Sequence, residues 1–317
     1  MRSAPIALTR LIAAELSTAV SAEVEALAEA IQREHGDSFL GLLFYGSCLR
    51  ENALEGRIAD FYLLVRSYRA FHRSRLAAAA NAALPPSVFY FETAHAGTTL
   101  RAKVAVLSLR DLVRGSASRS FLSYLWGRFA QPCRLLRATD SDVEKRVSGA
   151  LGSAVVTLLR RGLPLMPARF SSEELWQRAL AESYRTELRA ERGSRSGELV
   201  AADPARYEAL LRAAAEGRAL PGARRRGDGG GYEHQPSWAA ANRCALAWRL
   251  RRLAGKSLHV LRLVKSAFTF KDGLDYLLWK IERHSGVTLE VAPWQRRHPL
   301  LAAPGLAWRL YRKGAFC

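Results

Sequence analysis

The stretch LLFYGSCLRENALEGRIADFYLLV, residues 42–65, decides the expected fold of the chain. One apolar run ends at Gly46-Ser47, and a second apolar run surrounds Asp60. Two buried strands, joined by a turn and a short return segment, would place Ser47 and Asp60 side by side. Glycine lets a backbone approach phosphate oxygens, serine adds a hydroxyl donor, and aspartate can hold Mg²⁺. The stretch therefore predicts a phosphate-binding turn beside a metal-binding acid.

Such a pair of segments resembles the start of a nucleotidyltransferase site, but one acid is absent. The usual pattern is Asp-x-Asp on the second strand, whereas the residue two positions after Asp60 is Tyr62. Because tyrosine cannot be a second anionic ligand, the stretch alone leaves open a polymerase-like site and a plain hairpin. Glu92, which ends the apolar strand SVFYFE, is our candidate for the second metal ligand. An ordinary surface acid at the end of a strand is an equally good interpretation of Glu92.

Lysines are the candidates for neutralising a triphosphate. Lys103 lies within the apolar strand LRAKVAVLSL, where an inward lysine is costly unless it meets an anion. The alternative is a lysine on the solvent side of that strand. Lys256, Lys265 and Lys271 follow in the basic last third and could face a triphosphate or a lipid headgroup. The sequence does not rank these three, and each also fits a solvated helix face.

Periodicity and composition divide the chain into four parts. Residues 1–138 alternate apolar strands with helices, which predicts an α/β domain. Residues 139–220 hold three segments of helical periodicity, each preceded by a Ser or Asp cap candidate. Residues 221–237, PGARRRGDGGGYEHQPS, have the composition of a flexible linker. Residues 238–317 predict a basic C-terminal segment that begins with an amphipathic helix.

The charge of the chain indicates a polyanionic partner. Its 317 residues contain 48 Lys and Arg against 29 Asp and Glu, for a net charge of +19. Most of this excess lies beyond residue 220. Nucleic acid, an anionic membrane and phosphorylated substrates all fit such a charge, as does a soluble enzyme from an arginine-rich proteome.

Other patterns bear on location and metal binding. The four cysteines are scattered without a CxxC pair, so they predict neither a disulfide framework nor a zinc site. We see no secretory segment and no apolar stretch of transmembrane length. The expectation is an intracellular chain that is soluble or attached to a membrane only at its surface.

Four segments in a fixed order carry a family resemblance. Over residues 38–137, and more loosely over 262–286, the chain resembles the mitochondrial-type phosphatidate cytidylyltransferases, known as the mitochondrial translocator assembly and maintenance family, and their bacterial relatives. A single acid in an Asp-Phe strand is familiar in that family, so Tyr62 is no objection. Gln131 stands where the family usually has lysine, so any role of that lysine lacks support here. The segments are FYGSCLRENALEGRIADFYLLVRSYRAFH (44–72), LPPSVFYFE (84–92), RAKVAVLSLRDL (101–112) and LSYLWGRFAQPCRLL (122–136).

The resemblance implies a nucleotidyltransferase-fold domain, a mainly helical, winged-helix-like domain and a C-terminal segment that helps to form the site. It implies the reaction of CTP with phosphatidate to give CDP-diacylglycerol and pyrophosphate in phospholipid biosynthesis, with Mg²⁺ as cofactor. The partners would be CTP and phosphatidate in an anionic membrane, with no nucleic acid and with a homo-oligomer left open. The place would be cytoplasmic and peripheral on the inner face of the cell membrane, or the matrix side of the mitochondrial inner membrane in a eukaryote.

Each candidate residue has an expected role under this interpretation. Phosphatidate already carries an anionic phosphate, so catalysis would consist mainly of positioning and charge neutralisation. Two rival functions stay open: a nucleotidyltransferase that acts on RNA or another acceptor, and a non-catalytic basic membrane-binding protein. Asp60 and Glu92 would hold the metal, Gly46, Ser47 and Lys103 the triphosphate, and Lys265 and Lys271 would add positive charge from the C-terminal segment.

Overall fold

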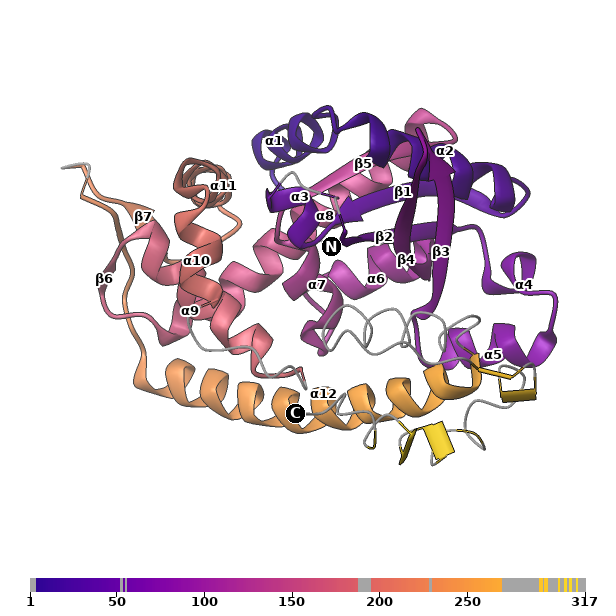
Figure 1. The fold of residues 1–317 in the computed structure, drawn as a ribbon. Coiled ribbons are helices and arrows are strands. Elements are labelled where there is room, and N and C mark those ends of the chain that lie inside the picture. Colours follow the sequence, from indigo (N-terminus) through magenta and orange to yellow (C-terminus); the bar gives the residue numbers. More distant parts are fainter. Residues whose placement is uncertain are drawn as a thin grey trace.

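A computed structural model describes residues 4–269 apart from 52–53, 55, 188–194 and 228–229, together with scattered positions between 291 and 312. The chain forms a five-stranded mixed sheet flanked by helices, a second group of helices with a small three-stranded sheet, and one long helix that passes both (Figure 1). This is a mixed α/β architecture, as the sequence predicts for its first part.

Two neighbouring strands of the large sheet come from the stretch 42–65. β1 (Phe39–Tyr45) and β2 (Ile58–Val65) pair antiparallel, and the short helix α3 (Ser47–Glu51) lies between them in the chain. The two apolar runs are therefore strands, and the Gly-Ser pair is the turn that leads into α3. The other strands are β3 (Ser87–His95), β4 (Thr98–Ser108) and β5 (Cys133–Ala138), in the sheet order β3-β4-β2-β1-β5, with β2 and β4 parallel.

Both faces of the large sheet are buried. On β2, Phe61 and Leu63 pack into a cluster with α2 (Ala22–His35), whereas Tyr62 and Leu64 point into a second cluster on the opposite face. Because both faces are buried, the sequences of these strands are continuous apolar runs and do not alternate with polar residues. The helices α4 (Tyr68–Phe71) and α5 (Arg75–Ala83) connect β2 to β3, and the second cluster is formed with α1 (Ile6–Leu16), α6 (Leu109–Ser116), α7 (Ser123–Phe129) and α8 (Ser141–Gly162).

The boundary predicted at residue 138 is not a break in the packing. α8 follows that boundary directly, and its side chains Val147, Leu151 and Leu158 are fully or almost fully buried against the helices that precede it. The same hydrophobic cluster continues through the 3-10 turn η1 (Leu163–Leu165) into the second group of helices. The α/β part and the helical part therefore share one core.

The segment 221–237, expected to be a flexible linker, contains a β-hairpin in the structure. β7 (Arg224–Arg225) and β8 (Tyr232–Glu233) pair with each other, and β8 also pairs with β6 (Arg169–Phe170). Tyr232 accounts for the difference, because its ring is buried beside Phe170 and its hydroxyl donates to Glu208 at 2.8 Å. The helices of this group are α9 (Ser172–Tyr184), α10 (Arg195–Ala201) and α11 (Pro204–Glu216).

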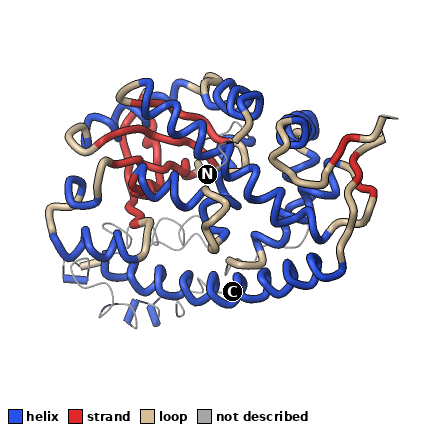
Figure 2. Tube along the Cα trace, turned by 180° about the vertical axis from the view of Figure 1, so that it is seen from behind, coloured by secondary structure: helices blue, strands red, loops and turns tan. Residues whose placement is uncertain are grey.

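The long helix α12 (Trp238–Thr269) crosses the molecule below both groups, as the views from the front and from behind show (Figures 1 and 2). Two side chains fix its first half. Trp248 donates to the carbonyl of Arg161 at 3.0 Å, and Arg251 donates to the carbonyl of Phe121 at 2.9 Å. Among the described residues, no helix combines the length and the hydrophobicity that crossing a membrane requires.

Candidate active site

The Gly-Ser turn lies directly against Asp60. Tyr45, the last residue of β1, is the register partner of Asp60 on β2. Gly46 has a φ of +94°, and a Cβ atom there would lie 2.7 Å from Asp60 Oδ2. A larger residue would thus meet both backbone strain and a clash with the carboxylate. Ser47 follows as the first residue of α3. The predicted neighbourhood of Gly46, Ser47 and Asp60 is present.

Lys103 stands beside Asp60 in the next strand. The two residues are register partners in the parallel pair of β2 and β4, whose backbones are about 4.8 Å apart. Alternation places Lys103 on the same face as Ala105 and Leu107, and these pack in the cluster that holds Tyr62 and Leu64. The Lys103 side chain therefore points to the Asp60 face of the sheet and is half-buried. A phosphate bound beside Asp60 would therefore lie next to Lys103.

Glu92, the second predicted metal ligand, is separated from Asp60 by one strand of the sheet. It lies on β3, which is two strands away from β2, a lateral separation of about 10 Å. Its carboxylate accepts a hydrogen bond from Tyr90 at 3.0 Å and lies 3.6 Å from Nε of Arg101. Burial and the neighbouring carboxylate raise the pKa of Tyr90 to about 12. The Glu92 side chain is half exposed and has the contacts of a surface acid at a sheet edge.

The donor set around Asp60 fits a magnesium ion that arrives with its substrate. Among the described residues, no group of three His, Cys, Asp or Glu side chains gathers in one place. Mg²⁺ commonly uses one or two protein carboxylates and completes its shell with phosphate oxygens and water. A single carboxylate such as Asp60 is therefore enough for a Mg²⁺ ion that takes its other ligands from substrate phosphates and water.

Tyr62 occupies the position of the second acid and has a different role. Its side chain is fully buried, and its hydroxyl lies 3.0 Å from the hydroxyl of Tyr124 on α7. Its ring is 4.9 Å from the rings of Tyr45 and Phe129, measured between centroids. Burial is the main reason that the pKa of Tyr62 is raised. Tyr62 is therefore a core residue, which packs two positions after Asp60 on β2.

Arg128 is a site residue that the sequence analysis did not single out. It comes from α7, and its guanidinium carbon lies 5.4 Å from the ring centroid of Tyr45 and 5.3 Å from that of Tyr124. One of its nitrogens is 3.4 Å from each carboxylate oxygen of Glu187. Its location in the quoted segment LSYLWGRFAQPCRLL was the available signal. Only the tertiary structure shows that this segment contacts Tyr45 on β1, the strand that pairs with β2 and Asp60.

The predicted C-terminal lysines are in three different situations. Lys265 donates to the carbonyl of Pro86 at 2.8 Å, to the carbonyl of Leu84 and to the hydroxyl of Ser87 at 3.3 Å, so it joins α12 to the start of β3. Burial, followed by the charge of Arg262, lowers the pKa of Lys265 to about 8. Lys256 is exposed on α12. Lys271 lies outside the described residues.

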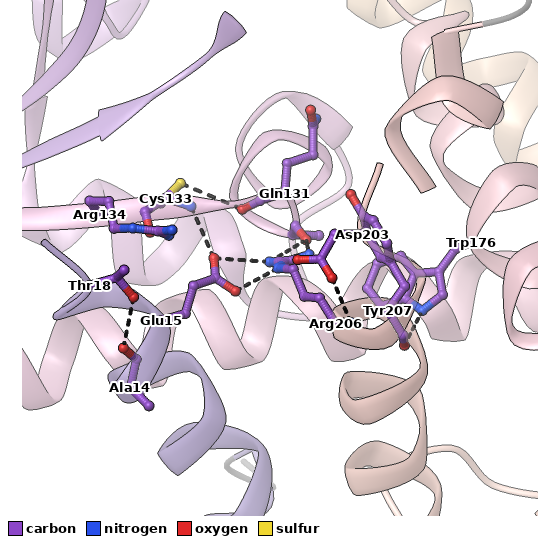
Figure 3. A network of polar contacts seen from close by, with 11 residues as sticks. Ala14, Glu15, Thr18, Gln131, Cys133, Arg134, Trp176, Asp203, Arg206 and Tyr207 are labelled. Carbon is purple, nitrogen blue, oxygen red and sulfur yellow. Dashed lines mark hydrogen bonds and ion pairs between the residues drawn. The ribbon is translucent and has the colours of Figure 1, made fainter. Parts of the chain in front are cut away.

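A buried polar network joins the second group of helices to the α/β part (Figure 3). Glu15 of α1 accepts from the backbone N–H of Cys133 at 3.0 Å and pairs with Arg206 of α11 at 2.5 Å. Arg206 also donates to the carbonyl of Ala130 at 3.3 Å. The network thus ties α11 to α1 and to the residues that immediately follow Arg128 and precede β5.

Comparisons with known proteins add little to this geometry. No model of a protein family matches the chain, and no curated protein does either. Among solved structures, a nucleotidyltransferase-like protein from Exiguobacterium sibiricum is similar at 10% sequence identity, over 92% of each chain, with a TM-score of 0.28. A similarity of that size supports no conclusion about fold or function.

Proposed function

We propose that this chain is a nucleotidyltransferase, and specifically a phosphatidate cytidylyltransferase that transfers CMP from CTP to phosphatidate. One observation carries the general part of the proposal. The Gly46-Ser47 turn presses against Asp60 so closely that only glycine fits, and Lys103 is the register partner of Asp60. A phosphate-binding turn, an acid and a lysine converge on one edge of the same sheet face.

The roles follow from the chemistry of each group. The Ser47 hydroxyl and the backbone at the start of α3 would bind phosphate oxygens of CTP, and Lys103 would donate to another of them. Asp60 would hold Mg²⁺, which when bound supplies positive charge to the departing pyrophosphate. Catalysis would then rest on positioning and charge neutralisation, the usual contribution of a protein to phosphoryl transfer.

The choice of acceptor is supported by what the site contains. A hydroxyl acceptor benefits from a general base, whereas a phosphate oxygen is already anionic at neutral pH. Asp60 is the acid at the turn, and Glu92 is two strands away and paired with Tyr90 and Arg101. An acceptor that needs no base, such as phosphatidate, suits this set of residues. The choice of CTP rests on the family resemblance, and so does the mitochondrial location in a eukaryote.

α12 supports peripheral attachment to an anionic membrane. The helix contains seven Lys and Arg residues and no acid. Leu246, Leu250 and Leu253 follow one another at helical spacing and each expose 49 to 68% of their surface. Cations beside exposed apolar side chains favour adsorption to anionic headgroups, at roughly 1 kcal/mol for each charge near the surface. Phosphatidate would reach the site from that surface.

The second group of helices supports a winged-helix-like domain. The chain passes from α8 through β6 to three helices and then to the hairpin of β7 and β8. In the small sheet, β8 lies between β6 and β7. A strand after the first helix that pairs with a later hairpin is the arrangement expected of a winged helix.

The proposal is tested by incubating the purified full chain with labelled CTP, Mg²⁺ and liposomes that contain phosphatidate. We expect CDP-diacylglycerol and pyrophosphate in equal amounts, and neither product without Mg²⁺. The same assay with ATP, GTP, UTP and an RNA acceptor tests the rival nucleotidyltransferases. Nucleotide transfer to RNA alone would overturn the lipid part, and no transfer from any nucleotide to any acceptor would overturn the whole proposal.

A further inference from the structure

The ring of Tyr124 is contacted by two guanidinium groups from different helices. The guanidinium carbon of Arg262, on α12, lies 4.1 Å from the ring centroid, and that of Arg128, on α7, lies 5.3 Å from it. The ring itself is fixed, because its hydroxyl lies 3.0 Å from the buried hydroxyl of Tyr62. Stacking on a fixed ring restricts where the charge of each arginine can lie.

The charges of the two arginines are compensated unequally. Arg128 is within 3.4 Å of both carboxylate oxygens of Glu187. The Nε atoms of both arginines are buried without a hydrogen-bond partner among the described residues. Arg128 forms an ion pair with Glu187, whereas Arg262 lines a small cavity together with Tyr124 and Glu187. Lys265 follows one turn later on the same acid-free helix. A buried donor without a partner is costly, so this place favours an anion from outside the chain.

These groups belong to the Asp60 face of the sheet. Tyr62 follows Asp60 by two residues on β2 and therefore points to the same side. Arg128 also contacts the ring of Tyr45, which is the register partner of Asp60. Tyr62 contacts Tyr124, and Tyr124 contacts Arg262, on this face of the sheet. Ser47 and Lys103 flank Asp60 in the strands and the turn, whereas Arg262 approaches from the helix side.

We propose that Arg262, positioned by Tyr124 and assisted by Arg128, binds the phosphate of the acceptor, a phosphomonoester. This inference rests on the proposed nucleotidyl transfer and adds to it a separate subsite for the second substrate. The planar fork of an arginine can bind two phosphate oxygens at once, and a position away from Ser47 and Lys103 leaves the triphosphate its own contacts. Tyr124 is a positioning residue in this arrangement, because it acts through the two arginines.

The subsite suits the transfer step. An anionic oxygen of the acceptor phosphate would form the new bond to the α-phosphorus of the nucleotide. The bond from that phosphorus to the oxygen bridging to the β-phosphate would break, and its electron pair would leave with pyrophosphate. No proton has to be removed. An in-line displacement requires that the acceptor oxygen and the leaving oxygen lie on opposite sides of the α-phosphorus.

Kinetics can separate this subsite from the triphosphate site. We expect Arg262→Gln to raise the KM for phosphatidate at least about tenfold at saturating CTP, and to change the KM for CTP less than twofold. Arg262→Lys should recover part of the loss. Arg33→Gln is the matched control, since Arg33 is an exposed arginine on α2, which covers the opposite face of the sheet. An equal rise in both KM values, or no rise for phosphatidate, would overturn the inference.

A binding measurement keeps this test independent of turnover. Calorimetric titration without CTP uses short-chain phosphatidate, the phosphodiester phosphatidylglycerol of equal chain length, and glycerol 3-phosphate. We expect the wild-type chain to bind phosphatidate more tightly than the diester, and Arg262→Gln to lose that preference while its melting temperature stays unchanged. Binding of glycerol 3-phosphate with the same dependence on Arg262 would support a soluble phosphomonoester as acceptor.

The outcomes separate the two proposals. Phosphomonoester binding that depends on Arg262, in a chain without transferase activity, would keep the subsite and remove the proposed function. If the chain has transferase activity but Arg262→Gln still prefers phosphatidate to the phosphodiester, the proposed function stands and the subsite is removed. Tyr124→Leu should weaken phosphatidate binding more than Tyr124→Phe, because phenylalanine keeps the ring that contacts the arginines and loses only the hydroxyl contact with Tyr62.

Discussion

The strand pair β1–β2 and the helix α12 both bring charged groups to the Asp60 side of the large sheet, but they do so by different means. In the strand pair, a close contact between neighbours in one hairpin places Asp60 against Gly46. In α12, the position of Arg262 depends on Tyr124, from a helix almost 140 residues earlier in the chain. A short sequence pattern can therefore identify the first set of groups, whereas the second needs the tertiary fold.

The largest effect is expected for the strand pair. Asp60→Asn keeps the size of the side chain and removes the charge that would hold Mg²⁺, so turnover with CTP and phosphatidate should fall by about a thousandfold or more. The melting temperature should change little, which a thermal scan would check. An Asp60→Asn protein that retains a tenth of the activity would contradict the role of Asp60.

A substitution in the network of Figure 3 tests whether the stability of the α/β part, which contains the strand pair, depends on its contact with the second group of helices. Arg206→Met leaves the buried carboxylate of Glu15 without its partner, which should lower the free energy of unfolding by about 3 kcal/mol. Urea unfolding would measure the loss. Arg212→Met, at an exposed position of the same helix, is the control and should change stability by less than about 0.5 kcal/mol.

Gly46→Ala tests the close contact between the turn and Asp60. An alanine there would meet an unfavourable φ, worth about 1–3 kcal/mol, and its Cβ would displace the carboxylate. We expect activity to fall about a hundredfold, as a displaced catalytic group usually causes. Gly97→Ala is a matched control with φ +77° and no atom near its Cβ. If both variants lose activity equally, strain and not contact with Asp60 is the cause.

The pH dependence of Lys265 sharpens the description of α12. Its folded-state pKa of about 8 lies below the usual lysine value of about 10.4. Between these values the folded state binds fewer protons than the unfolded state, so this lysine makes stability rise with pH over that window. Anion binding should weaken severalfold above about pH 8, as the ammonium loses its charge. Lys265→Met should abolish both trends, and phosphatidate KM with urea unfolding from pH 7 to 10 would measure them.

The smallest effect is expected for the acid at the edge of the sheet. Glu92→Gln should change kcat and the dependence on Mg²⁺ concentration less than twofold, because Glu92 lies two strands from Asp60 and pairs with Arg101. A rise of tenfold or more in the Mg²⁺ requirement would restore Glu92 as a metal ligand and contradict its placement.

The sequence predicts the local part of this site well and the distant part poorly. Strands 39–45 and 58–65 follow from their apolar runs, and the closeness of Gly46 to Asp60 follows from the short return between them. The separation of Glu92 from Asp60 could not be predicted, because a single strand does not reveal how many strands lie between it and β2. The hairpin within 221–237 was missed because its glycine content hides Tyr232, whose burial depends on Phe170. Arg128 and Arg262 have no local pattern, since their partners lie in other helices.

The pair of Glu15 and Arg206 also constrains the order of events during synthesis. The two residues are 191 positions apart, and at roughly 5–20 residues per second Arg206 leaves the ribosome about 10–40 s after Glu15. Until then, the carboxylate at the end of α1 has no cationic partner from α11. The nascent α/β part can therefore form its strands early but completes its buried polar contacts late. During co-translational folding, the contact between α1 and α11 should therefore form only after α11 has emerged, and the contacts of Trp248 and Arg251 should follow once α12 has emerged.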